Sequence, residues 1–401
     1  MAELKSPRKK TLRDVDVADA DCVVRVDFNV PVTPGSGEIT DDSRIRATLP
    51  TLHHLLVNNS RVIVLTHFGR PKGRLVEDLR LHRVRRRLSD WLNQDVVDLG
   101  GPSGQSVGEA AASLGRGEVG MLENLRFDPG EEANDPAFAE SLAGLGDLFV
   151  NDAFGAAHRA HASVVGIADF LPAVAGYLMA DEIEMLTEAL ESDASPSVAV
   201  VGGAKVADKI KVLDSLSKRF DVILIGGGMT AAFLRAQGKR SGKGDVSEEE
   251  VHAAGRLLFS SSAEVVVPVD VVTAQEFSAD AKAEIRTADA IRPKDLVLDI
   301  GPETRERYSA RLRNARRIVW NGPMGVSEWP QFAGGTHSVA RVIAAVPNAF
   351  KVVGGGSTAA VIEELGLGEH ITHVSTGGGA SLEFLEGRTL PGVAALDDLE
   401  D

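Results

Sequence analysis

The sequence alternates short β-branched runs with helical patterns, and this alternation constrains the fold more than any other feature. Each run ends in Gly, Asn or a charged residue before the next helical pattern begins. Runs that are nearly continuous in Val, Ile and Leu suit strands covered on both faces. The alternation therefore predicts an α/β protein with parallel sheets.

The positions of these runs divide the chain into two similar halves. The first half has predicted strands at 22–26, 61–66, 119–122 and 148–151, with helices at 45–58 and 81–93. The second half has predicted strands at 197–201, 222–225, 264–267, 318–320, 351–353 and 372–374. A helical pattern at 180–191 and a polar stop at 192–196 separate the two halves.

A chain of 401 residues has room for about two domains of roughly 150 residues each. We therefore expect two doubly wound parallel-sheet lobes, at 1–179 and 197–380, with a cleft between them. The segment 180–196 is the predicted interdomain helix and hinge.

The charge balance excludes some classes of protein. There are 43 Lys and Arg against 58 Asp and Glu, a net charge of −15, which argues against nucleic-acid and membrane partners. The single cysteine, Cys22, excludes a disulfide within the chain. No stretch approaches the roughly 18 apolar residues of a membrane span, and no signal peptide is evident, so we expect a cytoplasmic protein. The 30 Arg against 13 Lys suit adaptation to high salt, although lineage bias explains this composition equally well.

Basic and polar residues follow the predicted strands of the first half. Ligands of parallel sheets bind outside the carboxyl ends of the strands. The residues at these positions are Asp27, Phe28, Asn29, His67, Phe68, Gly69, Arg70, Arg126 and Arg159, and Arg44 stands where the first helix begins. Any one of these arginines taken alone is more simply a surface salt bridge. Together they predict a site for a substrate that carries phosphate or carboxylate. The arginine-rich run at 83–87 lies in mid-helix and is predicted to face solvent.

Glycines follow the strands of the second half. They are Gly202 and Gly203, then Gly226, Gly227 and Gly228, then Gly322, then Gly354, Gly355 and Gly356, and then Gly377, Gly378 and Gly379. Glycine lets the backbone approach a ligand closely, and free N–H groups at a helix start bind phosphate oxygens. Lys205 and Lys209 follow the first strand and suit phosphate contacts, although their spacing also suits an exposed helix face. No GxxxxGK[ST] sequence is present.

An NAD-dependent oxidoreductase is an alternative, because the segment 226–231 matches a dinucleotide-binding loop. The acidic residue that such a site needs about 20 residues later, at the end of a second strand, is missing. The arginine-rich strand ends of the first half also count against a dinucleotide enzyme.

Nine sequence segments resemble the motifs of phosphoglycerate kinase, in unbroken order from about residue 21 to the end of the chain. They are RVDFNVPV (25–32), THFGRP (66–71), LENLRF (122–127), DAFGAAHRAH (152–161), VGGAKVADK (201–209), IGGGM (225–229), PVDVVT (268–273), WNGPMG (320–325) and LEGRTLPG (385–392). The resemblance implies two Rossmann-like lobes. It also implies a glycolytic enzyme that transfers a phosphoryl group reversibly between 1,3-bisphosphoglycerate and ADP, giving 3-phosphoglycerate and ATP.

The resemblance also implies a role for each site residue. The first lobe would bind phosphoglycerate through Asp27, Phe28, Asn29, Arg44, His67, Phe68, Gly69, Arg70, Arg126 and Arg159. The second would bind Mg²⁺ with ADP or ATP through Lys205, Lys209, Gly226, Gly227, Gly228, Asn321, Glu328, Gly354, Gly355, Gly356, Ser357 and Thr358. We expect Arg44 and Lys205 to stabilise the transition state, together with the loop of Gly377, Gly378 and Gly379. No covalent nucleophile is needed, because positioning and charge neutralisation carry this chemistry.

The resemblance further implies a monomer without a redox cofactor, in which lobe closure precedes transfer and residues 381–401 return to the first lobe. One position departs from the family. Ser357 stands where the family commonly has an Asp that helps to hold the metal, so the metal ligands stay unassigned. A non-catalytic phosphosugar-binding protein with an inherited fold is the second alternative.

Overall fold

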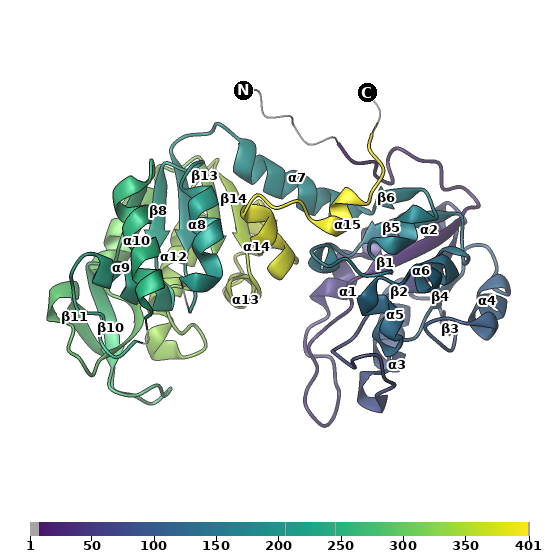
Figure 1. Cartoon of the computed structure of the whole chain (residues 1–401), viewed down its shortest axis with the longest axis horizontal. Coiled ribbons are helices and arrows are strands. Elements are labelled where there is room, and N and C mark those ends of the chain that lie inside the picture. Colours follow the sequence, from purple (N-terminus) through teal and green to yellow (C-terminus); the bar gives the residue numbers. More distant parts are fainter. Residues whose placement is uncertain (1–7, 205, 245, 400–401) are drawn as a thin grey trace. The chain divides into compact units, whose positions relative to one another are not determined.

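The buried β-branched runs form the central strands of two separate parallel sheets (Figure 1). The computed structural model describes residues 8–204, 206–244 and 246–399. Unit 1 comprises the described residues up to Ile183 and again from Thr389, and unit 2 comprises Glu184–Arg388. The predicted fold class, α/β with two parallel-sheet lobes, is confirmed.

In unit 1 the described residues form a sheet of six parallel strands. In spatial order these are β3 (Val96–Asp98), β4 (Val119–Met121), β2 (Arg61–Leu65), β1 (Asp21–Val26), β5 (Leu148–Asp152) and β6 (Ala173–Ala175). Val24 of β1 lies between Val64 of β2 and Val150 of β5, and all three are fully buried. The chain leaves β1 toward β2 and later returns to its other side with β5, so the topological switch point lies between β1 and β5.

The helices of unit 1 are α1 (Ser43–Ala47), α2 (Leu49–Val57), α3 (His82–Leu92), α4 (Gln105–Ala112), α5 (Pro129–Ala133), α6 (Pro136–Ala143) and α15 (Pro391–Ala394). The prediction of one helix over 45–58 is wrong, because the chain forms two helices that meet at Thr48. Pro50 has no N–H to continue the first helix and instead stands in the first turn of the second. Helix α3 buries Val84 and Leu88 and leaves its arginines half-buried or exposed.

The described residues of unit 2 contain a second sheet of six parallel strands. In spatial order these are β15 (His373–Val374), β14 (Phe350–Gly354), β13 (Arg317–Asn321), β7 (Ser197–Val201), β8 (Val222–Ile225) and β9 (Glu264–Val266). The chain proceeds outward from β7 to β9 and then outward from β13 on the other side. The switch point of unit 2 therefore lies between β7 and β13.

The helices of unit 2 are α8 (Ile210–Leu216), α9 (Thr230–Ala236), α10 (Glu248–Ser260), α11 (Pro302–Leu312), α12 (Gly334–Ala345), α13 (Gly356–Glu364) and α14 (Gly379–Leu385). Crossovers between parallel strands are right-handed as a rule, so the two outward runs of strands place helices on both faces of the sheet. The sequence analysis did not predict a small antiparallel sheet of β11 (Glu284–Thr287), β10 (Asp270–Ala274) and β12 (Leu296–Ile300). Its strand β11 alternates half-buried and exposed residues and has one apolar residue, the exposed Ile285, so it lacks the continuous apolar run by which other strands were found.

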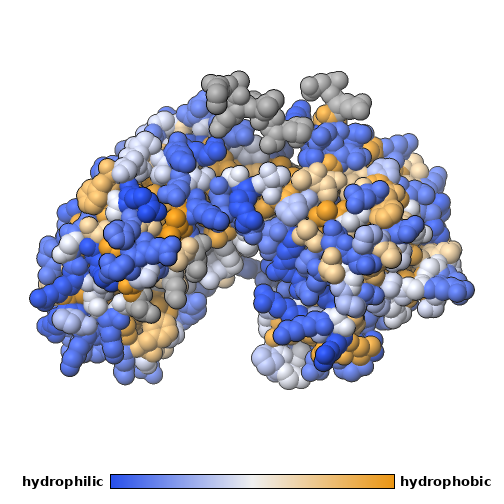
Figure 2. All heavy atoms as spheres, in the orientation of Figure 1, coloured by the Kyte–Doolittle hydropathy of each residue, from blue (hydrophilic) through white to orange (hydrophobic). Residues whose placement is uncertain are grey.

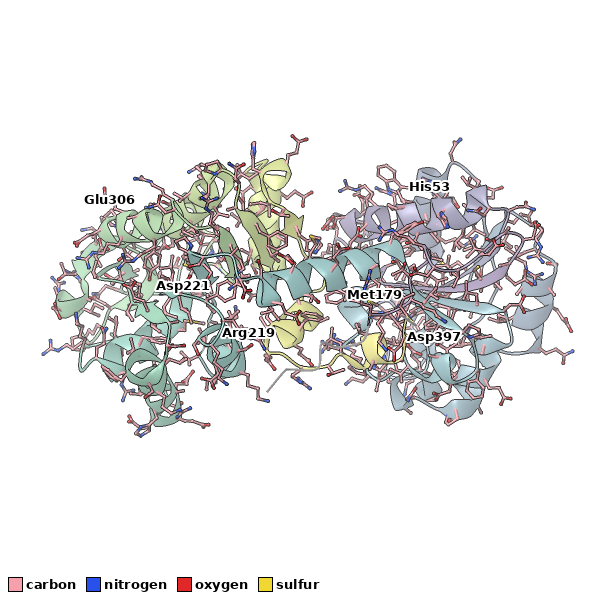
Figure 3. The ribbon with its side chains drawn as sticks, turned by 90° about the horizontal axis from the view of Figure 1, so that it is seen from above. His53, Met179, Arg219, Asp221, Glu306 and Asp397 are labelled. Atoms are coloured by element: carbon pink, nitrogen blue, oxygen red, sulfur yellow. The ribbon has the colours of Figure 1, made fainter. Side chains whose placement is uncertain are left out.

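Helix α7 (Tyr177–Glu191) begins in unit 1 and ends in unit 2. In unit 1, Asp152 at the end of β5 accepts a hydrogen bond from the backbone N–H of Met179 (3.1 Å; Met179 is labelled in Figure 3). In unit 2, Arg317 of β13 donates to the carbonyl oxygen of Ala189 (3.3 Å). A buried carboxyl group thus meets the positive end of the helix, and a buried guanidinium meets its negative end.

The C-terminal segment packs on unit 1. The N–H of Gly392 donates to the carbonyl of Ala157 (2.8 Å), and the N–H of Asp397 donates to the carbonyl of Ala173 (2.9 Å; Asp397 is labelled in Figure 3). Leu390 and Leu396 are buried. Residues 381–388, which the sequence analysis assigned to the returning segment, belong to unit 2.

The molecular surface seen in Figure 2 is mostly hydrophilic, with hydrophobic residues in scattered spots. Within the described ranges, no helix has both the length and the apolar character needed to cross a membrane.

Candidate active site

The predicted residues of unit 1 meet at the carboxyl ends of β1 and β2. Asp27 follows β1, and its Oδ2 accepts a hydrogen bond from Nη1 of Arg44 on α1 (2.7 Å). Oδ1 of Asn29 accepts from the N–H of Gly69 (2.9 Å), so the segments that follow β1 and β2 are held together. Phe28 and Phe68 are buried.

Arg126 extends the same edge of the sheet. It lies in the turn η2 (Leu125–Phe127) after β4, and its Nη1 donates to the carbonyl of Gly69 (2.8 Å). Asn124 shapes this turn, because its Oδ1 accepts from the N–H groups of Phe68 (3.1 Å) and Arg126 (3.2 Å). The sequence analysis quoted Asn124 in a motif but gave it no role.

Arg159 and Arg70 complete the predicted set in unit 1. Arg159 follows β5 and its Nε donates to Nε2 of His158 (3.1 Å). Arg70 is exposed after β2. The strands that carry these residues include β1 and β5, which flank the switch point of unit 1.

The electrostatics of this edge favour an anion. Burial, and then the charge of Arg159, lowers the pKa of Arg126 to about 10, so the guanidinium stays charged near neutral pH. Burial, and then the charges of Arg25, Arg126 and Arg159, holds the pKa of His67 well below its ordinary value, so this imidazole is neutral. A cluster in which cations depress one another's pKa gains most from a ligand that brings negative charge.

Glycine-rich turns follow β7, β8, β13 and β14 of unit 2. Gly227 has φ +67°, and a Cβ there would lie 2.5 Å from the carbonyl oxygen of Gly203, so the turns after β7 and β8 approach too closely for any side chain. Gly355 has φ +91° and caps the start of α13. A Cβ on Gly356 would meet no atom within 4 Å, which leaves open space above this helix start.

Lys209 and Asn321 lie beside these turns. Nζ of Lys209 donates to Oδ1 (2.5 Å) and to the carbonyl oxygen (3.1 Å) of Asn321. Nδ2 of Asn321 is buried and has no hydrogen-bond partner within the described ranges. It lies near Gly354 and Gly355, 3.3 and 3.5 Å from where a Cβ would stand on each. Its N–H donors suit a phosphate oxygen that reaches this turn.

The other predicted residues of unit 2 fall into different places. Thr358 is buried, and its Oγ1 accepts from the N–H of Gly322 (2.9 Å), so it braces the turn after β13. Ser357 is exposed in the first turn of α13, and Glu328 is exposed after β13. Gly378 has φ +52° and precedes α14. Lys205 lies outside the described residues. Those described residues contain no group of three or more His, Cys, Asp or Glu side chains arranged to hold a metal ion.

A family model described as phosphoglycerate kinase matches residues 12–388. The chain belongs to the phosphoglycerate kinase family. The phosphoglycerate kinase of Moorella thermoacetica is 50% identical over 393 residues, which cover 97% of this chain and 99% of that protein. That of Thermomicrobium roseum is 52% identical over 393 residues, with 96% and 99% covered. The phosphoglycerate kinase structure from Coxiella burnetii has a TM-score of 0.86 at 38% identity and covers 96% of this chain and 98% of that one.

Membership of the phosphoglycerate kinase family confirms the resemblance on which the sequence analysis rested. It also confirms the predicted enzyme class, a glycolytic kinase that transfers a phosphoryl group reversibly between 1,3-bisphosphoglycerate and ADP. The assignment of single residues to substrates stays a prediction.

Proposed function

We propose that the chain carries out this transfer directly, from one bound substrate to the other, with phosphoglycerate on unit 1 and nucleotide on unit 2. The different chemistry at the carboxyl ends of the two parallel sheets carries the proposal. Unit 1 has charged arginines and a neutral histidine there, and unit 2 has glycine turns beside Lys209 and beside Nδ2 of Asn321, which has no hydrogen-bond partner among the described residues.

Unit 1 suits a small carboxylate that also bears a phosphate. Arg126, Arg159 and Arg70 supply planar forks that match either anion. Arg44 is held by a carboxylate, that of Asp27, so its guanidinium is oriented before substrate binds. An oriented donor costs little reorganisation when charge develops, and this supports a transition-state role for Arg44.

Unit 2 suits the phosphates of ADP or ATP. The turns after β7, β8, β13 and β14 present backbone close to a ligand, and α13 begins at one of them. Lys209 brings the positive charge, and Lys205 and the loop of Gly377, Gly378 and Gly379 are proposed to act on the transferring group. In-line transfer needs the two bound substrates to come together, and we assign that step to a movement about α7.

Mg²⁺ enters as part of the nucleotide substrate. Ser357 is exposed in the first turn of α13, and its hydroxyl fits a hydrogen bond from metal-bound water. Mg²⁺ would neutralise charge on the phosphates, while this chain's own residues position the nucleotide. We further propose a cytoplasmic monomer without a redox cofactor, whose net charge of −15 and excess of Arg over Lys reflect adaptation to high salt.

The test is phosphoryl transfer from ATP to 3-phosphoglycerate with Mg²⁺, coupled to NADH oxidation, at low and at molar KCl. Turnover of about 1–100 per second, the usual range for kinases, is expected, with higher activity and melting temperature in molar KCl. Absence of turnover in both salts, from folded protein, would favour a non-catalytic binding protein. Equal activity and equal melting temperature in both salts would reject the proposed salt adaptation but not the proposed reaction.

Calorimetry separates the two units. Arg126→Met should weaken phosphoglycerate binding and leave Mg-ADP binding unchanged, and Lys209→Met should do the reverse. If Arg126→Met weakened Mg-ADP binding, or Lys209→Met weakened phosphoglycerate binding, the assignment of substrates to units would be contradicted.

A further inference from the structure

Arg25 is a charged residue inside the central strand of unit 1. It stands in β1 among valines and is fully buried. Its Nε donates to Oγ of Ser163 (2.8 Å), its Nη1 donates to the carbonyl of Val26, and its Nη2 lies 3.1 Å from Nδ1 of His67. The sequence analysis gave Arg25 no role, although a charge within a β-branched strand is itself a signal.

Glu131 balances this buried charge. It is fully buried, and it accepts from the N–H (3.0 Å) and Oγ (2.7 Å) of Ser163. Its Oε1 lies 4.0 Å from Nη2 of Arg25. Burial opposes the ionised form, but the contacts with His161, Arg25 and Ser163 outweigh it and lower the pKa of Glu131. The carboxylate of Glu131 therefore balances the charge of Arg25, and hydrogen bonds hold its guanidinium in place.

The contact between Arg25 and His67 determines where the imidazole carries its proton. A guanidinium has only donors, so Nδ1 of His67 must accept from it. His67 is neutral, because burial and the neighbouring arginines lower its pKa. A neutral ring with an accepting Nδ1 carries its single proton on Nε2. The other tautomer would set an N–H against the donor of Arg25.

We propose that Arg25 is a positioning residue that holds His67 as the Nε2–H tautomer. His67 then presents a fixed hydrogen-bond donor to an anionic oxygen of the substrate. Without Arg25, Nδ1 is free to carry the proton toward Oδ1 of Asp27, which lies 4.0 Å away, and Nε2 becomes an acceptor that repels an anion. The hydrogen bond from His67 to the substrate rests on the proposed function, whereas the tautomer of His67 does not.

The tautomer is measurable in the unaltered protein. The full chain is labelled with ¹⁵N-histidine, and long-range ¹H–¹⁵N correlations are recorded between pH 5.5 and 8. The signals of His67 are identified by their absence from the spectrum of the His67→Gln variant. We expect the Nε2–H pattern for His67 across this range. An Nδ1–H pattern, a mixture of tautomers or an imidazolium would overturn the proposal, whether or not the protein is an active kinase.

Variants test the consequence for substrate. Arg25→Met combined with Glu131→Gln removes both buried charges and should raise the KM for 3-phosphoglycerate about 3- to 10-fold, the value of one hydrogen bond. In a His67→Gln background the same pair should change that KM less than about twofold. An equal loss in both backgrounds would show a purely structural role for Arg25 and refute the proposal.

Arg317 provides the matched control. It is also a buried arginine on a central strand, but it donates to the backbone carbonyls of Ala189 and Arg219 in unit 2. Arg317→Met should lower stability without changing the KM for 3-phosphoglycerate. If the Arg25 variant pair does not fold, the NMR measurement on the unaltered protein still decides the question.

Discussion

Replacing Arg44 by alanine tests the proposed transition-state role most directly. Nη1 of Arg44 lies 2.7 Å from Oδ2 of Asp27, and the arginine side chain is 33% exposed. Loss of a partly exposed ion pair changes the free energy of unfolding by about 0–1 kcal/mol. Removing a donor oriented toward charge that develops in the transition state costs about 10²- to 10³-fold in kcat, or about 2.7–4 kcal/mol. The expected effect on catalysis therefore exceeds the expected effect on stability.

The assay is the coupled transfer from ATP to 3-phosphoglycerate, with the 3-phosphoglycerate concentration varied at saturating Mg-ATP. Arg44→Ala should lower kcat about 10²- to 10³-fold, with the KM for 3-phosphoglycerate within about threefold of the parent value. Arg44→Lys keeps the charge but not the planar fork, so its kcat should fall between those of the parent and the alanine variant.

Arg46 offers a matched control on the same short helix. Its Nε lies 2.9 Å from Oδ1 of Asp42, and its side chain is 45% exposed. Arg46→Ala should leave kcat unchanged. If Arg44→Ala raises KM as much as it lowers kcat, Arg44 is a ground-state binding residue. If it changes neither, the reasoning from the Asp27 contact is refuted.

Two further predictions concern Ser357 and Asp152. Ser357→Asp, in the first turn of α13, should tighten Mg-nucleotide binding by adding a charge beside the metal, and unchanged or weaker affinity in titration calorimetry would reject a metal-side position for this residue. Burial raises the pKa of Asp152 to about 7, so the folded state keeps a proton that the unfolded chain releases near pH 4. The free energy of unfolding therefore falls as pH rises between about 4 and 7. Relative to Asp152→Asn, the parent should thus lose at most about 1.4 kcal/mol of unfolding free energy per pH unit over this range in urea titrations. Equal pH slopes would contradict the shifted pKa.

The sequence predicted the central strands well because their burial leaves a continuous apolar signal. The run 148–151 was found, and β5 extends it by one residue to Asp152. The short strands β3 and β6 were not found, because β3 buries only Val96 and β6 is Ala-Val-Ala, so neither shows a run of large buried β-branched residues. The break at Thr48 was missed although Pro50 marks it, since the apolar period continues across both helices.

The candidate site was predicted by position rather than by contact. Strand ends identified Asp27, His67 and Arg126, because parallel topology brings carboxyl ends to one edge. Sequence position does not reveal which side chains are buried or hydrogen-bonded to other groups of the protein and which are available to a ligand. Phe28 is buried, Thr358 braces the turn after β13, and Arg25, Glu131 and Ser163 come from distant parts of the chain.

The C-terminal segment of unit 1 has a consequence for synthesis on the ribosome. The backbone groups of Ala157 and Ala173 have their partners in Gly392 and Asp397, which follow all of unit 2 in the chain. At about 5–20 residues per second, translation of the roughly 200 residues of unit 2 takes about 10–40 s. During that interval unit 1 lacks the C-terminal segment, which contributes the buried side chains of Leu390 and Leu396. Unit 1 is therefore completed only after unit 2 has been synthesised, and the nascent chain exposes an uncovered apolar surface until residues 389–399 emerge.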